Sequence, residues 1–232
     1  MRRHVEAELL DGLGAENLLA QRSRQDLRRV HRAMATLWII QRALHRAPAG
    51  FIPHTLLELG AGDGSLMVRL AQKQATCWPA MDMTLLDRVN LIEPQTLEAI
   101  RTLGWTPHVM TVDIFRWLED RDDARKDMVV ANLFLHHFSA DELVRLLAGI
   151  AARSRIFLCC EPQRSALSLV GAHCVGVLGA GPVTRHDAVL SVHAGFRAQE
   201  LSALWPNPQA WVLHEYSAGL FTHVFLAVRK GT

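Results

Sequence analysis

The chain has little of what marks many specialised classes of protein. Of its 232 residues, 6% are aromatic, one is tyrosine and four are cysteine. Cys77, Cys159, Cys160 and Cys174 show no C-x-x-C spacing, so the sequence indicates no disulfide framework and no zinc site. The net charge of +2 is too small to favour a nucleic acid or an anionic membrane surface as a partner.

Long apolar runs are also missing. The amino-terminal end carries Arg2 and Arg3, followed by further polar residues and no apolar h-region, so we expect no signal peptide. No run is apolar and long enough to predict a membrane span. With 50% hydrophobic and 21% charged residues, the chain suits one sizeable globular domain with a full core. We therefore expect a reduced, cytoplasmic protein.

The residues before about 50 predict helix. An apolar stripe recurs at three- and four-residue steps, and arginines lie largely off it; the stripe consists of Leu27, Val30, Met34, Leu37, Ile40 and Leu44. Pro48, Gly50 and Pro53 then break the pattern. Two interpretations stay open: a helix packed on a sheet or on a dimer partner, or a lid over an active site. Residues 1–50 are thus expected to form a helical extension of a domain at 51–232.

The stretch 55–70, TLLELGAGDGSLMVRL, contains a glycine-rich motif between an apolar run and a helical pattern. A short apolar run leads into Gly60, Gly62 and Gly64, after which apolar residues fall at helical spacing. This pattern predicts a strand, a tight glycine turn and the start of a helix. Glycine permits a positive φ and lets a ligand approach the main chain. A glycine-rich turn without a ligand is the plainer alternative.

The glycine spacing separates two ligand classes. A dinucleotide fingerprint has the spacing G-x-G-x-x-G, and here the third glycine comes one residue early, which disfavours a dinucleotide-dependent oxidoreductase. The pattern E-x-G-x-G-x-G resembles motif I of the class I S-adenosylmethionine (SAM) methyltransferases. The resemblance covers roughly residues 54–229. It implies an α/β, Rossmann-like fold with a mostly parallel sheet of seven strands and an antiparallel last strand.

In that family the acid before the glycines, here Glu58, supports the loop near the amino end of the cofactor. The loop itself, with Gly60, Ala61, Gly62 and Gly64, packs against the amino-acid and ribose parts of SAM. The resemblance implies SAM as the cofactor and S-adenosylhomocysteine (SAH) as its product.

Two further acids follow apolar strands in register with the glycine loop. Asp87, with Arg88 beside it, ends a strand at 83–86, and the resemblance implies that it accepts hydrogen bonds from both ribose hydroxyls. Asp113 and Ile114 follow a strand at 109–112 and are expected to contact the adenine. Alternatively, Asp113 caps the helix that begins after it.

The best acid–base candidates come after the predicted fourth strand, at 127–133. Asn132 and Leu133 should adjoin the cofactor, and the loop to residue 138 resembles motif IV of the family, where the methyl group meets its acceptor. His136 and His137 lie in this loop, and they precede a capping box whose N-cap is Ser139. We favour His137 as the base, because the nearby helix N-terminus disfavours a protonated imidazole.

The chain departs from a minimal Rossmann pattern at 163–197, an apolar, glycine-rich insertion that follows a fifth strand at 155–160. In the family this is where substrate-specific elements lie, so we expect the acceptor to be bound by His137, Glu161, His173 and His186. Two other roles stay open for Glu161: orienting one of the histidines, or capping the helix that follows. A core layer or a dimer contact is the alternative. Some metal-dependent relatives carry an Asp-Asn pair after this strand, and this chain has Glu161-Pro162, so we predict no metal. A helix at 199–205 and strands at 211–216 and 222–229 should complete the fold.

These patterns predict a SAM-dependent methyltransferase acting on a hydroxyl, favoured as phenolic, of a small, largely apolar secondary metabolite. The stretches SRQDLRRVHRAM and CEPQRS are loosely similar to bacterial methyltransferases of polyketide or phenolic-lipid pathways. Two alternatives stay open: a protein or nucleic-acid methyltransferase, and a catalytically silent SAM-binding subunit of a biosynthetic complex. The expected partner is a small-molecule acceptor, with no nucleic acid and no membrane span, and a homodimer is compatible with the sequence.

Overall fold

The computed structural model describes residues 1–14, 16–78, 80–120 and 125–231. Within them, one sheet of seven strands has the order β3-β2-β1-β4-β5-β7-β6. β7 runs antiparallel to both of its neighbours, and the other pairs are parallel. The strands are β1 (Thr55–Leu59), β2 (Met81–Asp87), β3 (Trp105–Thr111), β4 (Lys126–Asn132), β5 (Ser154–Pro162), β6 (Trp211–Ala218) and β7 (Thr222–Arg229). The predicted α/β fold with an antiparallel last strand is confirmed.

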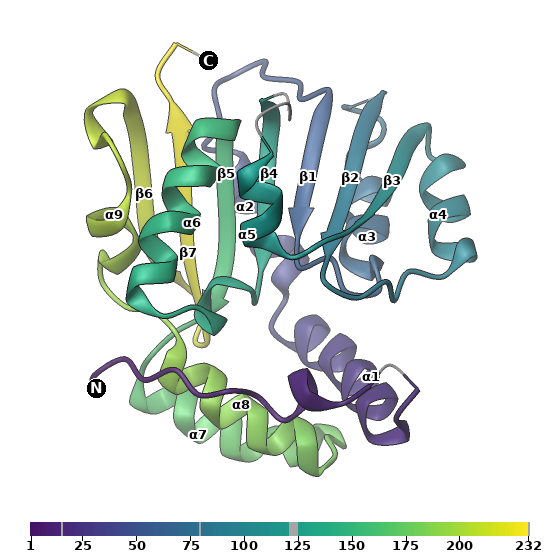
Figure 1. The fold of residues 1–232 in the computed structure, drawn as a ribbon, viewed down its shortest axis with the longest axis vertical. Coiled ribbons are helices and arrows are strands. Elements are labelled where there is room, and N and C mark those ends of the chain that lie inside the picture. The colour runs from purple at the N-terminus through teal and green to yellow at the C-terminus, as the bar shows by residue number, and fades with distance from the viewer. Residues whose placement is uncertain (15, 79, 121–124, 232) are drawn as a thin grey trace.

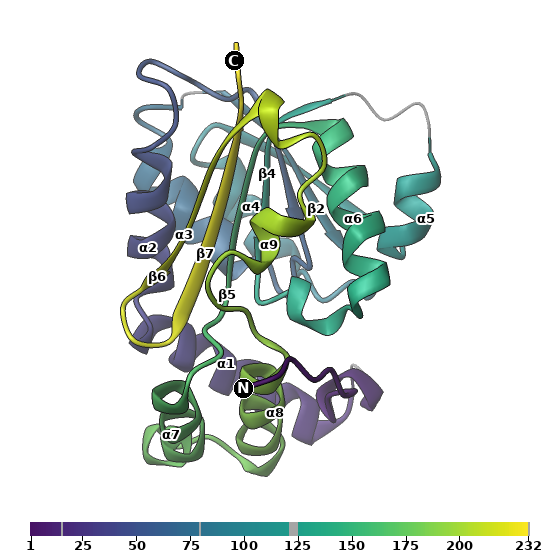
Figure 2. The ribbon, with the colours of Figure 1, turned by 90° about the vertical axis from the view of Figure 1, so that its left-hand side faces the viewer.

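Helices cover both faces of the sheet, which is why the central strands are apolar at nearly every position. Along β1, Leu56 packs into one core cluster and Leu57 into the other, as the two-residue period of a strand requires. One face is covered by α2 (Thr36–Leu44), α3 (Ser65–Gln74) and α4 (Pro94–Arg101). The other is covered by α5 (Ile114–Glu119), α6 (Ala140–Arg153) and α9 (Glu200–Leu204), as Figures 1 and 2 show.

A further layer lies across the carboxyl edge of the parallel strands. It contains α1 (Leu18–Ala33), α7 (Ala166–Cys174) and α8 (Pro182–Ala194), together with the amino-terminal residues (Figure 1). Short 3-10 helices lie at η1 (Leu10–Gly12), η2 (Leu135–His137), η3 (Val175–Leu178) and η4 (Pro208–Ala210). The segment 163–197 thus forms a helical pair at this edge. Among the described residues, no helix has the length and apolar character needed to cross a membrane.

The amino-terminal region differs from the single helical stretch that its periodicity predicts. Ala35 has a left-handed backbone (φ 53°), which separates α1 from α2. Residues 1–14 are not α-helical. α2 packs on the sheet, whereas α1 is joined to α8 through the buried Asp26, which accepts from Gly181 N at 2.7 Å and from Thr184 Oγ1 at 3.2 Å. The change of direction at Ala35 lets one helix bury its apolar face on the sheet and the other reach the carboxyl edge.

Local signals at element ends agree with the structure in two places and fail in one. Ser139 and Glu142 form the predicted capping box of α6. Asp113 is the N-cap of α5, accepting from Phe115 N at 2.9 Å, so the capping alternative is confirmed. The predicted third strand at 109–112 was wrong in its bounds, because β3 begins at Trp105. β3 is an edge strand whose inward residues alternate with exposed ones, and continuous hydrophobicity is a poor guide to such a strand.

Candidate functional site

The glycine turn after β1 has the geometry that only glycine adopts freely. Gly60, Gly62 and Gly64 have φ values of 69°, 55° and 72°. The loop is tied to β2, because Gly60 N and Ala61 N both donate to Leu86 O, at 2.9 and 3.0 Å. At Gly60, an added Cβ would lie 2.5 Å from the ring of Phe134. This glycine therefore allows the loop after β4 to pack directly on the turn.

Gly62 differs from Gly60 in what surrounds it. A Cβ built on Gly62 would meet no atom of the described residues within 4 Å, so the main chain here borders open space. Its N–H donates to Asp87 Oδ2 at 2.8 Å, and Val89 N donates to Asp87 Oδ1 at 3.0 Å. Asp87 therefore holds the glycine turn against the end of β2, and each of its oxygens keeps a lone pair for another donor.

Glu58, at the end of β1, is buried without a full set of partners. The residue is 2% exposed, and its Oε2 atom has no hydrogen-bond partner among the described residues. Burial raises the pKa of Glu58 well above its ordinary value, and the nearby carboxylates of Asp63 and Asp87 raise it further. A buried carboxylate of this kind needs a proton or a positively charged partner.

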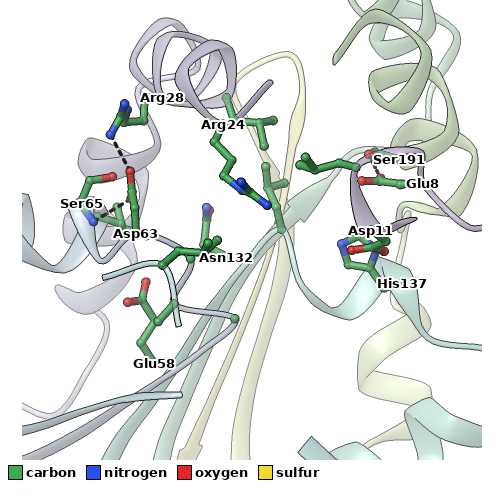
Figure 3. A pocket seen from close by; sticks show the side chains of 18 of the residues that line it. Glu8, Asp11, Arg24, Arg28, Glu58, Asp63, Ser65, Asn132, His137 and Ser191 are labelled. Atoms are coloured by element: carbon green, nitrogen blue, oxygen red, sulfur yellow. Dashed lines mark hydrogen bonds and ion pairs between the residues drawn. The ribbon is translucent and has the colours of Figure 1, made fainter. Parts of the chain in front are cut away.

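These groups open into a cavity of about 210 Å³, which we call the glycine-loop cavity (Figure 3). Of the residues predicted to bind cofactor, six line it: Glu58, Gly60, Ala61, Gly62, Asn132 and Leu133. Five others do not: Gly64, Asp87, Arg88, Asp113 and Ile114. The side chain of Ile114 belongs to the hydrophobic core on the α5 side of the sheet.

Sequence reasoning missed most of the opposite wall of the cavity. It is formed by the amino-terminal residues Glu8, Leu10 and Asp11, by α1 and by α8 (Figure 3), the helical contributions being Arg24, Leu27, Arg28 and Ser191. Asp63, Ser65, Leu66 and Leu91 complete the missed part of the lining. Asp63, Ser65 and Leu66 belong to the glycine-turn stretch itself, whereas no local motif marks the lining residues from the amino-terminal segment, α1 and α8, which reach the cavity through tertiary packing.

The loop after β4 is organised by a buried carboxylate. Glu161, at the end of β5, is 0% exposed and accepts from Phe134 N at 3.1 Å and Leu135 N at 2.8 Å. Leu133 takes up a left-handed backbone (φ 51°) as the chain enters this loop. The oxygens of Glu161 face the main chain and His136, as the alternative that it orients a histidine requires. Glu161 does not line the cavity, and its contact with the acceptor stays a prediction.

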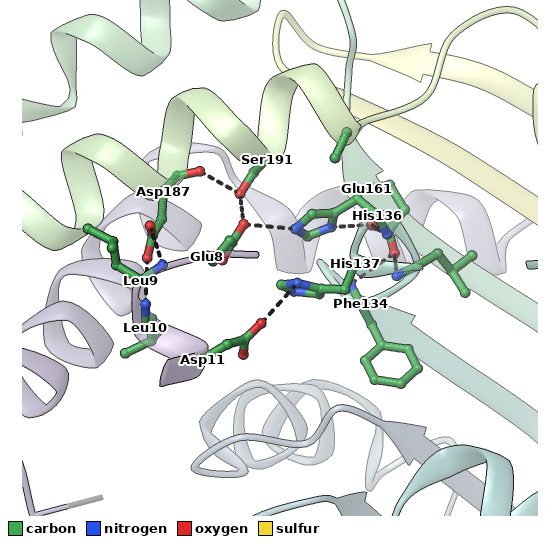
Figure 4. Close-up of polar contacts among 12 residues, drawn as sticks. Glu8, Leu9, Leu10, Asp11, Phe134, His136, His137, Glu161, Asp187 and Ser191 are labelled. Atoms are coloured by element: carbon green, nitrogen blue, oxygen red, sulfur yellow. Dashed lines mark hydrogen bonds and ion pairs between the residues drawn. The ribbon is translucent and has the colours of Figure 1, made fainter. Parts of the chain in front are cut away.

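His136 lies between two carboxylates. Its Nδ1 is 2.8 Å from Glu161 Oε2, and its Nε2 is 3.4 Å from Glu8 Oε1 (Figure 4). Burial acts to lower the pKa of His136, but hydrogen bonds and charge attraction from Glu161 and Glu8 outweigh it and raise the pKa to about 9. His136 is therefore protonated at neutral pH and cannot accept a proton there.

His137 has the opposite electrostatic environment. Burial and the neighbouring charge of His136 lower the pKa of His137, although Glu8, Asp11 and Glu161 oppose them. The two imidazole rings lie 4.2 Å apart between centroids. The side chain of His137 is 28% exposed and lines the cavity, and its Nδ1 is 3.5 Å from Asp11 Oδ2. His137 is thus the neutral histidine of the pair.

The other two histidines predicted to bind the acceptor lie elsewhere. His173, on α7, is exposed and donates from Nδ1 to Leu169 O at 2.7 Å. His186, on α8, is half exposed, with Nδ1 3.1 Å from Asp187 Oδ1. Neither lines the cavity, and Ser191 is the residue that α8 contributes to the lining. The helical period explains this, because His186 and Ser191 lie on different faces of α8.

One group within the described part of the chain has the composition of a metal site. Ligand atoms of Glu8, His136 and His137 lie within 4.8 Å of one another. Both ring nitrogens of His136 already face carboxylates, so a cation would have to displace a proton from this ring. The absence of a metal stays a prediction.

Comparison by sequence finds no matching family model and no matching curated protein. Among solved structures, the chain is similar to the plantazolicin methyltransferase BpumL in complex with SAH, with a TM-score of 0.65 and 11% identity over 91% of this chain and 89% of that one. It is also similar to magnesium protoporphyrin IX methyltransferase from Synechocystis with bound SAH, with a TM-score of 0.52 and 16% identity over 95% and 91%. An O-methyltransferase family protein from Burkholderia thailandensis gives a TM-score of 0.59 and 16% identity, over 93% of this chain but 61% of that longer one.

These similarities show that the chain shares the Rossmann-like α/β fold of these solved methyltransferases. In this chain β7 is inserted between β5 and β6 and runs antiparallel to both. In such open α/β sheets, ligands bind beyond the carboxyl ends of the strands, which is where the glycine-loop cavity lies.

Proposed function

We propose that this chain is a SAM-dependent methyltransferase that transfers a methyl group to a hydroxyl, favoured as phenolic, of a small and largely apolar secondary metabolite. The observation that carries the proposal is Glu58, which lines the cavity and whose buried Oε2 atom has no hydrogen-bond partner in the part of the chain that the structure describes. SAM carries an α-ammonium group, and a carboxylate in this position would bind it by charge and hydrogen bonding. The fold and the glycine turn support the same cofactor.

The residues around the cavity fit SAM in two further respects. The open space over Gly62 allows a ligand to contact the main chain where a Cβ would otherwise intrude. Asp87 has spare lone pairs for the ribose hydroxyls while it holds the glycine turn. We propose Glu58, Gly60, Ala61, Gly62, Asn132 and Leu133 as the central contacts, with Gly64, Asp87, Arg88, Asp113 and Ile114 toward the ribose and adenine.

The chemistry that SAM supplies when bound is an electrophilic methyl group on a sulfonium. The protein has to align the acceptor with it, and correct alignment alone lowers the barrier considerably. We propose that His137 is the base that takes the acceptor proton, because this ring is neutral and lines the cavity. His136 is held as a cation and is proposed to act beside it as a fixed charge.

The lining of the cavity supports a largely apolar acceptor. Leu10, Leu27 and Leu91 contribute aliphatic side chains from three separate parts of the chain. Burying a methylene group contributes about 0.8 kcal/mol to binding. The acceptor is therefore proposed to lie between these leucines and the two histidines.

Two measurements test the proposed function. In a calorimetric titration the protein should bind SAM and SAH, and NAD should not compete; binding of NAD without SAM would overturn the cofactor assignment. In a transfer assay with small phenols, His137→Ala should reduce turnover by about 10²–10⁴-fold and leave SAM affinity nearly unchanged. Full turnover by His137→Ala on a weakly acidic phenol would exclude His137 as the base.

The same assays separate the alternatives. SAM binding without turnover on any small acceptor, but with turnover on a peptide or an oligonucleotide, would indicate a macromolecular methyltransferase. SAM binding with no turnover at all would indicate a silent subunit.

A further inference from the structure

The amino-terminal segment, residues 1–13, crosses the carboxyl edge of the sheet along α8, and we call it the strap (Figure 1). One of its anchors is Asp187, a residue that does not line the glycine-loop cavity. The two oxygens of Asp187, on α8, accept from Leu9 N and Leu10 N, both at 2.9 Å. Asp187 is 5% exposed, so this contact is shielded from water. The strap is thereby fixed to α8 by its main chain.

The start of the strap is anchored as well. His4 N donates to His193 O at 3.1 Å. Arg3 donates from Nε to Ala194 O at 2.7 Å and from Nη2 to Phe138 O at 2.8 Å. The strap therefore joins the end of α8 to the loop that carries the two histidines.

Between these anchors the strap places one acidic side chain inside the site. Glu8 has a side chain that is 12% exposed, and its Oε1 lies 3.4 Å from His136 Nε2. The hydroxyl of Ser191, on α8, donates to the same oxygen. Because a buried carboxylate is costly without partners, Glu8 depends on these two contacts for its charge.

The protonation of His136 follows from hydrogen-bond chemistry. A neutral imidazole has one N–H and can donate to one carboxylate only. His136 faces Glu161 at Nδ1 and Glu8 at Nε2, so satisfying both requires a proton on each nitrogen. Glu161 is part of strand β5, whereas Glu8 belongs to the strap and contacts His136 only when the strap packs on α8. The packing of the strap against α8 therefore determines whether His136 keeps a proton on Nε2 as well as on Nδ1.

We propose that Glu8 is a positioning residue of the acceptor site, which fixes His136 as the cation that lies behind the ring of His137. Glu8 does not contact the reacting atoms in this proposal and acts through His136. Its consequence for methyl transfer rests on the proposed function, but its effect on His136 does not.

Charged groups from several elements face the two histidines. Glu161 lies on β5, and Arg3 of the strap donates to His136 O at 3.2 Å. Asp11, which follows Glu8 along the strap, is 3.5 Å from His137 and 3.7 Å from Arg88. Glu8 is the one among these that contacts the outer nitrogen of His136, so its removal has the most direct effect on that ring.

The test is a pH titration of the histidine rings by nitrogen-15 NMR, which needs neither SAM nor an acceptor. In the unaltered protein His136 should carry protons on both nitrogens at about pH 7. Glu8→Gln should lower the titration midpoint of His136 by at least about one unit, a tenfold loss of proton affinity. Glu8→Asp is the matched control, which keeps the charge and should retain most of that affinity.

A second variant acts on the strap without touching the site. Asp187→Asn weakens the anchor of Leu9 and Leu10 and should lower the midpoint of His136 in the same direction as Glu8→Gln. On a phenolic acceptor, Glu8→Gln should lower kcat and change the pH profile, while KM for SAM stays within about twofold. A purely structural role for Glu8 would not shift the profile.

Two results would overturn the proposal: a neutral His136 at pH 7 in the unaltered protein, or an unchanged His136 midpoint in a folded Glu8→Gln variant. If Glu8→Gln does not fold, the protonation state of His136 in the unaltered protein and its titration midpoint in Asp187→Asn still test the proposal. If His136 behaves as expected but no methyl transfer is found, the proposed function fails and the role of Glu8 in holding His136 stands.

Discussion

Replacing His136 by glutamine should move the acid limb of the pH–rate profile to higher pH. His137 must be neutral to accept a proton, so the acid limb marks its protonation. In the unaltered protein the charge of His136 helps to keep the pKa of His137 below its ordinary value. Glutamine removes that charge, and Glu8 and Asp11 remain to attract a proton to His137. Because the repulsion from His136 is lost while the attraction of Glu8 and Asp11 persists, the pKa of His137 should rise.

The size of the shift can be worked from the geometry. The ring centroids are 4.2 Å apart. At an effective dielectric constant of about 20, two unit charges at that distance repel by about 4 kcal/mol, or about three pKa units. Because the side chain of His137 is 28% exposed, water screens part of this repulsion. We therefore expect the midpoint of the acid limb to rise by about one to two pH units.

The assay is kcat/KM for a weakly acidic phenol, measured across the pH range in which the enzyme stays folded. His173→Gln is the matched control, because this histidine is exposed on α7 and does not line the cavity. It should leave the profile unchanged. If His136→Gln also leaves the acid limb in place, then either His137 is not the base or His136 is not a cation, and the reasoning is wrong.

Two other predictions concern stability and the glycine turn. The pKa of His136 is raised to about 9 in the folded state. The stabilising contribution of His136 should therefore be fully present below about pH 6.5 and be lost as the pH rises through about 9. Urea denaturation should show this loss as a decrease in the free energy of unfolding on the order of 3 kcal/mol. An unchanged free energy of unfolding across that pH window would contradict the prediction. Gly60→Ala places a Cβ 2.5 Å from Phe134 and should cost about 2–4 kcal/mol of stability. Gly62→Ala, which also has a positive φ but meets no neighbouring side chain, should cost about 1–2 kcal/mol of stability. It should nevertheless weaken SAM binding more than Gly60→Ala does. Equal losses of stability in the two variants would show that the contact with Phe134 does not distinguish these glycines.

The part of the fold that could be read from sequence depends on signals between near neighbours. The glycines after β1 and the capping box at Ser139 are local, since each requires only a few adjacent residues to adopt one backbone geometry. The buried strand β4 is marked by its continuous apolar residues. The break at Ala35 has no such marker, because an alanine in a left-handed conformation is imposed by packing on both sides.

The candidate site divides in the same way. Glu58 and the glycine turn could be assigned because they are contiguous in sequence and share one structural role. Glu8 could not be assigned, since its role arises from a contact with His136 across 128 positions of chain. Glu161 was noticed for its place at a strand end, but the sequence does not show that its oxygens are taken up by main-chain N–H groups.

The two edges of the sheet have separate uses, and this has a practical consequence. The strap, α1 and α8 all lie at the carboxyl edge, whereas the loop at 205–210 precedes β6 at the opposite edge (Figure 1). Gln209 in that loop is exposed, and Gln209→Cys would offer a point for a fluorescent label or for attachment to a surface. Cys77 and Cys174 are also exposed and would first have to be replaced. A molecule attached in this way would present its cavity to the solution, so that ligand exchange could be followed one molecule at a time.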